Sequence, residues 1–198
     1  MERMLHYIAG TVDMGITYRV HTRMSSRSLV KLLMYADSDW AGDIKVSKDP
    51  QGRSRGGYII TLNGNAVHWS SKLRTIGGEP DGQAEIDLAS AQAEIGTLSE
   101  GCRRLIWLIR TLRSAGFTVP TVTVYEDNQA AIRIAENQSI SERTRHIHNK
   151  DMFVRNLVRA KEITLKYIKS ADNIADFFTK ILSLTVFRTF RDRIMGME

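Results

Sequence analysis

The chain of 198 residues contains 42% hydrophobic and 25% charged residues, which predicts one globular domain with short appendages and excludes a disordered or fibrous protein. No apolar run approaches the roughly 20 residues that span a bilayer, and the N-terminus lacks the apolar core of a secretory signal, so we expect an intracellular protein with no membrane contact. The formal net charge of +6 favours binding to phosphate backbones, but many basic proteins bind no nucleic acid, so charge alone is a weak indicator.

The N-terminal third predicts an appendage followed by an antiparallel sheet. Residues 1–20 indicate a short amphipathic helix, a glycine break and a brief strand, and a polar linker follows. From Leu29 the run LVKLLMYA is apolar on both alternating faces, which is typical of a central strand, and this strand ends at Asp37. The runs GGYIITLN and NAVHWSS flank Asn63-Gly64, the strongest short-range signal for a hairpin. We therefore expect a meander of three antiparallel strands.

A loop and a long helix come next. The segment from Leu73 to Glu85 contains GGEPDG, which predicts an exposed loop. From about Ser90 to Ala115 apolar residues recur at alternating spacings of three and four, which predicts an amphipathic helix that Gly116 ends. The apolar stripe consists of Ile95, Leu98, Cys102, Leu105, Ile109 and Leu112. Because Cys102 is the only cysteine, an internal disulfide and a cysteine-rich zinc site are excluded, and its place in the stripe predicts a core residue.

In the C-terminal half, predicted strands alternate with predicted helices. TVTVYED is a short strand that ends at Asp127, and NQAAIRIAEN is compatible with a helix. After the polar, basic stretch SERTRHIHNK another helix is expected to run to about Ala160. ITLKYIK alternates as a strand, DNIADFFTKIL predicts a helix, and the tail predicts a last short helix. Strands separated by crossover helices pair in parallel, so we expect a mixed sheet with helices packed on it.

Three acidic residues occupy positions that folding alone does not favour. Asp37 and Asp127 each close a β-rich run, and the carboxyl ends of strands in α/β sheets are where ligands are usually bound. At about 100° per residue, Glu94 lies about 50° from the centre of the apolar stripe and therefore faces the sheet. Glu100 falls nearly opposite and is the expected solvated acid. A carboxylate beside a core needs a cation, a hydrogen-bond network or a metal, so Glu94 is the most informative of the three.

Each of these acids, taken singly, is also explained as a helix cap, a turn former or a salt-bridge partner, and Asp39 and Asp43 are interpreted as turn acids. Taken together, they favour a different interpretation. Several hard oxygen ligands without a cluster of cysteine or histidine favour Mg²⁺ or Mn²⁺ over zinc. Such a site suits phosphoryl-transfer chemistry with two metal ions roughly 4 Å apart.

Six motifs follow one another along the chain: YADSDWAGD (35–43), GYIITLNGNAVHWSSK (57–72), IDLASAQAEI (86–95), YEDNQAAI (125–132), RTRHI (143–147) and DNIADFFTK (172–180). Together they resemble the ribonuclease H domain at the C-terminal end of copia-type LTR retrotransposon polyproteins. Residues 1–28 resemble the connecting segment that joins polymerase and ribonuclease H in those polyproteins. We therefore predict a connecting segment over 1–28, a ribonuclease H domain over 29–182 and a helical tail over 183–198.

The resemblance implies an α/β, ribonuclease H-like fold with a five-stranded mixed sheet in the order 3-2-1-4-5 and helices on its faces. It also implies that Asp37, Glu94, Asp127 and Asp176 are the catalytic residues and bind two Mg²⁺ ions, for which Mn²⁺ substitutes. Asp176 rests on the resemblance alone, because the apolar stripe of its predicted helix leaves it on the solvent side. Asp172, at i,i−4 from Asp176, can equally be a helix N-cap.

The implied function is that of an endonuclease that hydrolyses the RNA strand of RNA–DNA hybrids during retrotransposon reverse transcription. The implied partners are the hybrid and the reverse transcriptase polymerase domain of the same polyprotein, and we expect the isolated domain to be a monomer. The implied location is the cytoplasm, within virus-like particles. Two alternatives remain: a non-catalytic nucleic-acid-binding domain of the same fold, and a transposase or integrase-type strand transferase, which usually carries a Glu on its last helix.

Loop cations and polar residues are the candidates for nucleic-acid binding: Arg53, Arg55, Lys72, Asn128, Gln129, Arg143, Arg145 and His146. Any of the cations can instead be an ordinary surface residue, His148 is interpreted as a polar residue of a basic loop, and Trp40 and Trp69 are expected to pack. The chain departs from the family pattern in a loop over 74–85 that is longer than expected. It also has His148 and Met152 where the family has Asp and His, and a glutamine precedes Ala93-Glu94. No histidine lies between Ile168 and Asp176, so an auxiliary histidine on that loop is not expected.

Overall fold

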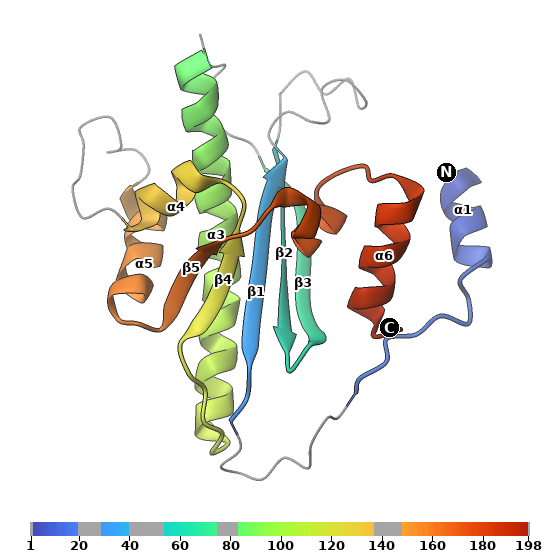
Figure 1. Ribbon diagram of the computed structural model, residues 1–198, viewed down its shortest axis with the longest axis horizontal. Helices are drawn as coiled ribbons and strands as arrows, with labels where there is room; N and C mark the ends of the chain where they lie inside the picture. The colour runs from blue at the N-terminus through green and yellow to red at the C-terminus, as the bar shows by residue number, and fades with distance from the viewer. Residues whose placement is uncertain (1, 20–28, 40–53, 75–82, 137–147, 198) are drawn as a thin grey trace.

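The computed structural model describes residues 2–19, 29–39, 54–74, 83–136 and 148–197, except for the side chains of residues 3, 74, 83–89 and 148–151 (Figure 1). The predictions made for the 21–28 linker, Trp40, Asp43, Arg53, Arg143, Arg145 and His146 therefore lie outside the described residues. The helices are α1 (Glu2–Ala9), α3 (Gln83–Ser114), α4 (Gln129–Glu136), α5 (His148–Arg159), η2 (Ser170–Asp172), η3 (Ile174–Phe178) and α6 (Leu184–Met195). The strands are β1 (Leu32–Asp39), β2 (Ser54–Leu62), β3 (Asn65–Arg74), β4 (Val122–Glu126) and β5 (Ile163–Tyr167).

The strands form one five-stranded sheet in the order β3-β2-β1-β4-β5. β1 pairs antiparallel with β2 and parallel with β4, and β4 pairs parallel with β5. The predicted mixed sheet and its strand order are confirmed. Because β1 and β4 are parallel neighbours in the middle of the sheet, their carboxyl ends lie side by side.

Two predicted turns have the backbone geometry that their residues suggest. Asn63 and Gly64 have φ values of 50° and 85°, so both occupy the left-handed region that a tight two-residue hairpin between β2 and β3 requires. Gly116, with φ of 90°, follows the end of α3 as predicted. These positions explain why the meander and the end of the long helix could be recognised from local sequence.

The sheet is covered on both faces (Figure 1). Along β1 the side chains of Leu32, Met34 and Ala36 belong to the larger core, which α3, α4 and α5 complete, and Cys102 is buried there as predicted. Tyr35 points to the other face, where it packs with residues of η3 and α6. Because side chains alternate along β1, Asp37 lies on the same face as Tyr35 and η3. None of the described helices is both long and apolar enough to cross a membrane.

The structure differs from the sequence-based predictions at four places, three of which are local. The brief strand expected before residue 20 is absent from residues 14–19, which connect to α6 through a backbone hydrogen bond from Thr17 N to Met195 O of 2.8 Å. The predicted loop from Leu73 to Glu85 is shorter, because β3 continues to Arg74 and α3 begins at Gln83. Trp69, expected to pack, is 44% exposed on β3.

The largest difference is at 170–178, where the predicted α-helix is replaced by the two 3₁₀ helices η2 and η3. Asn173 separates them, because its backbone is extended and its side chain caps η3 by accepting from Ala175 N. Asp172 is exposed and is not the cap. This change from a period of about 3.6 to about 3.0 residues alters which side chains of the segment face the sheet.

Candidate active site

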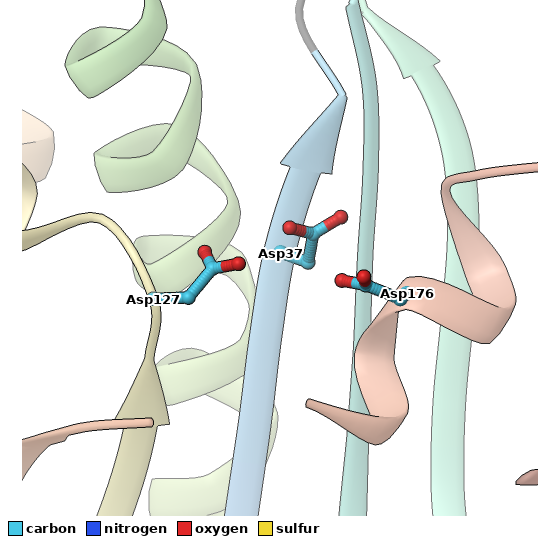
Figure 2. A group of neighbouring side chains, drawn as sticks. All are labelled: Asp37, Asp127 and Asp176. Atoms are coloured by element: carbon cyan, nitrogen blue, oxygen red, sulfur yellow. The ribbon is translucent and has the colours of Figure 1, made fainter. Parts of the chain in front are cut away.

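Three carboxylates from distant parts of the chain converge at the carboxyl end of the central strands (Figure 2). Asp37 lies near the end of β1, Asp127 directly follows β4, and Asp176 belongs to η3. One carboxylate oxygen of each lies within 4.8 Å of one from each of the others. Asp37 and Asp176 are only 1% and 6% exposed. The structure thus brings together three of the four acids predicted for the site.

Asp176 reaches this cluster because η3 is docked closely on the sheet. Asn173, which is fully buried, donates from Nδ2 to the backbone oxygen of Ala36 over 2.9 Å. On the other side, η3 approaches β2 at Gly57, where an added Cβ would lie 2.7 Å from Phe178 Cβ. Ser71 Oγ fixes the end of η3 by donating to Phe178 O over 2.6 Å. The helical periodicity that places Asp176 on the solvent side therefore does not apply to this segment, and Asp176 lies beside Asp37 and Asp127.

Three groups that bind these carboxylates, on Lys180, Thr179 and Ser170, were not predicted from the sequence. Lys180 Nζ lies 3.0 Å from Asp37 Oδ1, 2.9 Å from Asp176 Oδ1 and 3.9 Å from Asp127 Oδ2. Thr179 Oγ1 donates a short hydrogen bond to Asp37 Oδ2. Ser170 Oγ donates to Asp127 Oδ2 over 2.5 Å. Lys180 follows Asp176 by four residues, but that spacing usually indicates only a surface ion pair, so it was an insufficient signal.

A second group of carboxylates lies beside the first. Glu94, Glu126 and Asp127 each offer an oxygen within 4.8 Å of the others. Glu94 is 3% exposed, which confirms the predicted orientation toward the sheet. Glu126 is fully buried and was not predicted, although Val122, Val124 and Glu126 alternate on one face of β4 and could have indicated it. Glu94 Oε2 and Glu126 Oε2 are buried without a hydrogen-bond partner.

Burial makes this set of acids costly to ionise. Burial, followed by the charges of Glu126 and Asp37, raises the pKa of Glu94 well above its usual value. Burial also raises the pKa values of Glu126 and Asp127. The pKa of Asp176 rises to about 7, because burial and the charge of Asp37 outweigh its bonds with Lys180. For Lys180, burial lowers the pKa, but Asp37 and Asp176 outweigh it and the net change is upward.

The donor set fits a hard divalent cation. The ligand atoms available are carboxylate oxygens, which suit Mg²⁺ or Mn²⁺, and neither acidic group contains a cysteine or a histidine among the described residues. The two buried oxygens without a partner, on Glu94 and Glu126, are atoms that such an ion would satisfy. Asp127 belongs to both groups and can therefore bridge them.

The described candidates for nucleic-acid binding lie around this end of the sheet in different situations. Lys72 pairs with Glu100 over 2.7 Å, so Glu100, expected to be simply solvated, holds an ion pair and is half-buried. Asn128 uses Oδ1 to accept from Ala130 N and Ala131 N at the start of α4, which gives its side chain a capping role. Gln129 is exposed and Arg55 is half-buried. These contacts leave the predicted roles in nucleic-acid binding untested.

Comparison with known proteins relates the chain to transposon polyproteins. It is 31% identical over 98% of its length to the retrovirus-related Pol polyprotein from transposon RE1 of Arabidopsis thaliana, and 31% identical over 83% of its length to that from transposon TNT 1-94 of Nicotiana tabacum. The chain spans only 12% and 11% of those relatives. It is also 34% identical, over 59% of its length, to secreted RxLR effector protein 161 of Plasmopara viticola, of which it covers 68%. No protein-family model matches the chain.

Solved structures share the fold. A ribonuclease H1 isolated from compost by a metagenomic approach superposes with a TM-score of 0.51 at 18% identity, over 75% of this chain and 92% of that one. The N-terminal ribonuclease H domain of a Mycobacterium tuberculosis protein superposes with a TM-score of 0.50 at 14% identity, over 85% of this chain and 99% of that one. At these identities the likeness shows that the architecture is ribonuclease H-like.

Proposed function

We propose that this chain, which belongs to the retrovirus-related Pol polyproteins of transposons and has the ribonuclease H fold, is a metal-dependent endonuclease that hydrolyses the RNA strand of RNA–DNA hybrids. The observation that carries the proposal is the convergence of buried carboxylates from β1, β4, α3 and η3 at one end of the sheet. A buried cluster of like charges is destabilising unless cations bind it, so its presence supports a metal-binding role.

In this proposal Asp37, Glu94, Asp127 and Asp176 hold two divalent ions, with Mg²⁺ as the physiological ion. When bound, the ions supply Lewis-acid stabilisation of the phosphate and an activated water. The protein supplies the positions of the ligands. Thr179 orients Asp37, Ser170 orients Asp127, and the docking of η3 on Gly57 fixes Asp176. No covalent bond between a side chain and the substrate is required.

Recognition of the hybrid is assigned to groups around the cluster. The 2′-hydroxyl distinguishes RNA from DNA at each position, and cationic side chains follow the phosphate backbone. We assign the backbone contacts to Arg53, Arg55, Lys72, Arg143, Arg145 and His146, and polar contacts to Asn128 and Gln129. Because the chain spans about a tenth of the polyproteins it resembles, the polymerase domain is proposed as a partner that adds affinity for the hybrid.

The proposal is tested with duplexes of one sequence, made as RNA–DNA, RNA–RNA and DNA–DNA, with each strand labelled in turn. With Mg²⁺ the wild-type chain should shorten only the RNA strand of the hybrid, and EDTA should stop the reaction. Loss of label from the DNA strand would indicate a different nuclease. A folded protein that cleaves none of the three would contradict the enzymatic assignment.

A second candidate, a domain of the same fold that binds nucleic acid without cleaving it, is favoured by the relative named as a secreted effector rather than as a polyprotein. Titration with Mn²⁺ separates the two candidates. An intact site should bind two ions, and Asp127→Asn should weaken both, because Asp127 belongs to both acidic groups. Binding of the hybrid by a protein that takes up no Mn²⁺ would support the second candidate.

A further inference from the structure

We propose that Lys180 is a positioning residue of this site: its ammonium group holds Asp37 and Asp176 together in the metal-free protein and is displaced when a divalent ion binds. The inference rests on the proposed function in one respect, that the site takes up divalent ions. It adds a residue outside the four predicted ligands, and it makes metal uptake an exchange of one cation for another.

The ammonium group of Lys180 lies among the carboxylates of the site. Lys180 Nζ lies 3.0 Å from Asp37 Oδ1 and 2.9 Å from Asp176 Oδ1. It also lies 3.9 Å from Asp127 Oδ2 and 3.4 Å from Ser170 Oγ. These three carboxylates are the same group that offers oxygens within 4.8 Å of one another, and Figure 2 shows them directed toward a common space. Lys180 therefore binds the oxygens that a metal ion would bind.

Lys180 is more accessible to solvent than the carboxylates that it binds. The side chain of Lys180 is 31% exposed, whereas those of Asp37 and Asp176 are 2% and 9% exposed. The carboxylates are thus fixed in the protein, while the lysine approaches them from the solvent side. A lysine has a flexible four-carbon stem and a strongly hydrated head, so it can leave the cluster for water without a rearrangement of the backbone.

The carboxylate cluster has more negative charge than Lys180 can balance. One ammonium group cannot neutralise three neighbouring carboxylates, and Glu94 and Glu126 form no ion pair with any described residue. The cluster therefore has two unequal halves. The half formed by Asp37 and Asp176 already contains a cation, and the half formed by Glu94, Glu126 and Asp127 contains buried oxygens without a partner. A first divalent ion should enter the second half, and a second ion should have to displace Lys180.

The local backbone links Lys180 to two of the predicted ligands. The N–H of Lys180 donates to Asp176 O over 3.0 Å, and the preceding residue, Thr179, donates to Asp37 through its hydroxyl. The turn at 176–180 thus presents an acid, a hydroxyl donor and a counter-ion to the same space. This arrangement explains how Asp37 and Asp176 remain close in spite of their mutual repulsion.

The test is a calorimetric titration of the full chain with Mn²⁺, carried out on wild type, Lys180→Met and Lys180→Arg. Lys166→Met, which changes an exposed lysine of β5, is the matched control. Wild type should bind two ions with unequal affinity. Lys180→Met should strengthen the weaker binding event on the order of tenfold or more, because it removes the competing charge. Lys180→Arg, which keeps the charge, and Lys166→Met should leave that event as weak as in wild type or weaker.

Two readouts follow Lys180 itself. In metal-free buffer Lys180→Met should unfold at a lower urea concentration than wild type, and saturating Mg²⁺ should remove the difference. In protein with ¹⁵N-labelled lysines, the ammonium signal of Lys180 should be visible in EDTA and should exchange rapidly with solvent after Mg²⁺ is added. If Lys180→Met is unfolded without metal, the Mg²⁺ concentration at which it folds replaces the urea midpoint.

The outcomes separate this inference from the proposed function. If Lys180→Met binds each of the two ions with the same affinity as wild type does, the role of Lys180 is overturned and the proposed function is left intact. An ammonium signal that persists at saturating Mg²⁺ would overturn the displacement in the same way. If neither protein binds Mn²⁺, the proposed function fails. Binding by Lys180→Met alone would support the inference most strongly.

Discussion

The pH dependence of folding in the absence of metal is a direct consequence of the buried carboxylates. The pKa of Asp176 is about 7 in the folded protein and 3.8 in an unperturbed chain. Between these values the folded state holds a proton on Asp176 that the unfolded state has released. The stability that this group contributes is therefore fully present below pH 3.8 and is lost as the pH rises through 7. At about 1.36 kcal/mol per pKa unit the whole shift would correspond to roughly 4 kcal/mol. Because solvent screens part of this interaction, the loss attributable to Asp176 should be smaller, on the order of 1–3 kcal/mol, which is still a substantial part of the stability of a typical domain.

The assay is urea denaturation in EDTA at intervals from pH 4 to pH 8, with Asp176→Asn as the variant and Asp172→Asn, a change at an exposed neighbour, as the control. Wild type and Asp172→Asn should lose stability as the pH rises, whereas Asp176→Asn should lose much less. Burial raises the pKa values of Glu94 and Glu126 in the same direction, so some decline should remain in the variant. Mg²⁺ at pH 8 should restore stability to wild type. A free energy of unfolding that rises between pH 4 and pH 7 relative to Asp176→Asn would refute this reasoning.

Three further substitutions test the construction of the site by urea denaturation. Gly57→Ala places a Cβ 2.7 Å from Phe178 Cβ and should cost about 1–3 kcal/mol while weakening Mn²⁺ binding; unchanged stability would show that η3 is not held there. Asn173→Ala removes a buried donor to Ala36 O and the cap of η3, and should also cost about 1–3 kcal/mol; a neutral effect would contradict the assigned role of that bond. Glu126→Gln keeps the acceptor for the backbone N–H of residue 128 but cannot ionise, so at pH 8 in EDTA it should stabilise the protein, and destabilisation would argue that Glu126 is already paired.

The parts of the fold that were predicted correctly depend on local patterns. Asn63-Gly64 defines the β2–β3 hairpin through its backbone geometry, and the two-sided apolar run of β1 identifies a central strand. The position of Glu94 follows from helical periodicity alone, because α3 is long and regular over this region. These features do not depend on the rest of the molecule, so the sequence is sufficient to predict them.

The remaining part of the site depends on contacts between distant segments. The segment at 170–178 has helix-like sequence, but the bond from Asn173 to Ala36 and the close approach to Gly57 fix it in 3₁₀ geometry. Its period of about 3.0 residues turns Asp176 toward Asp37, which a period of about 3.6 does not predict. The place of Lys180 among three carboxylates follows from the same docking. The predicted division of the chain at 28 and 182 stays a prediction.

In the proposed mechanism Asp37 binds the metal ions on which cleavage of the hybrid depends. The most direct measurement is the initial rate of release of labelled RNA fragments from an RNA–DNA hybrid in Mg²⁺, for wild type, Asp37→Asn and Asp39→Asn. Asp39 lies two residues further along β1, outside both acidic groups of the described residues, so it is a matched control. We expect Asp37→Asn to fold and to lose cleavage by about 100-fold or more, while Asp39→Asn cleaves nearly as fast as wild type. Equal rates for Asp37→Asn and wild type would contradict the account.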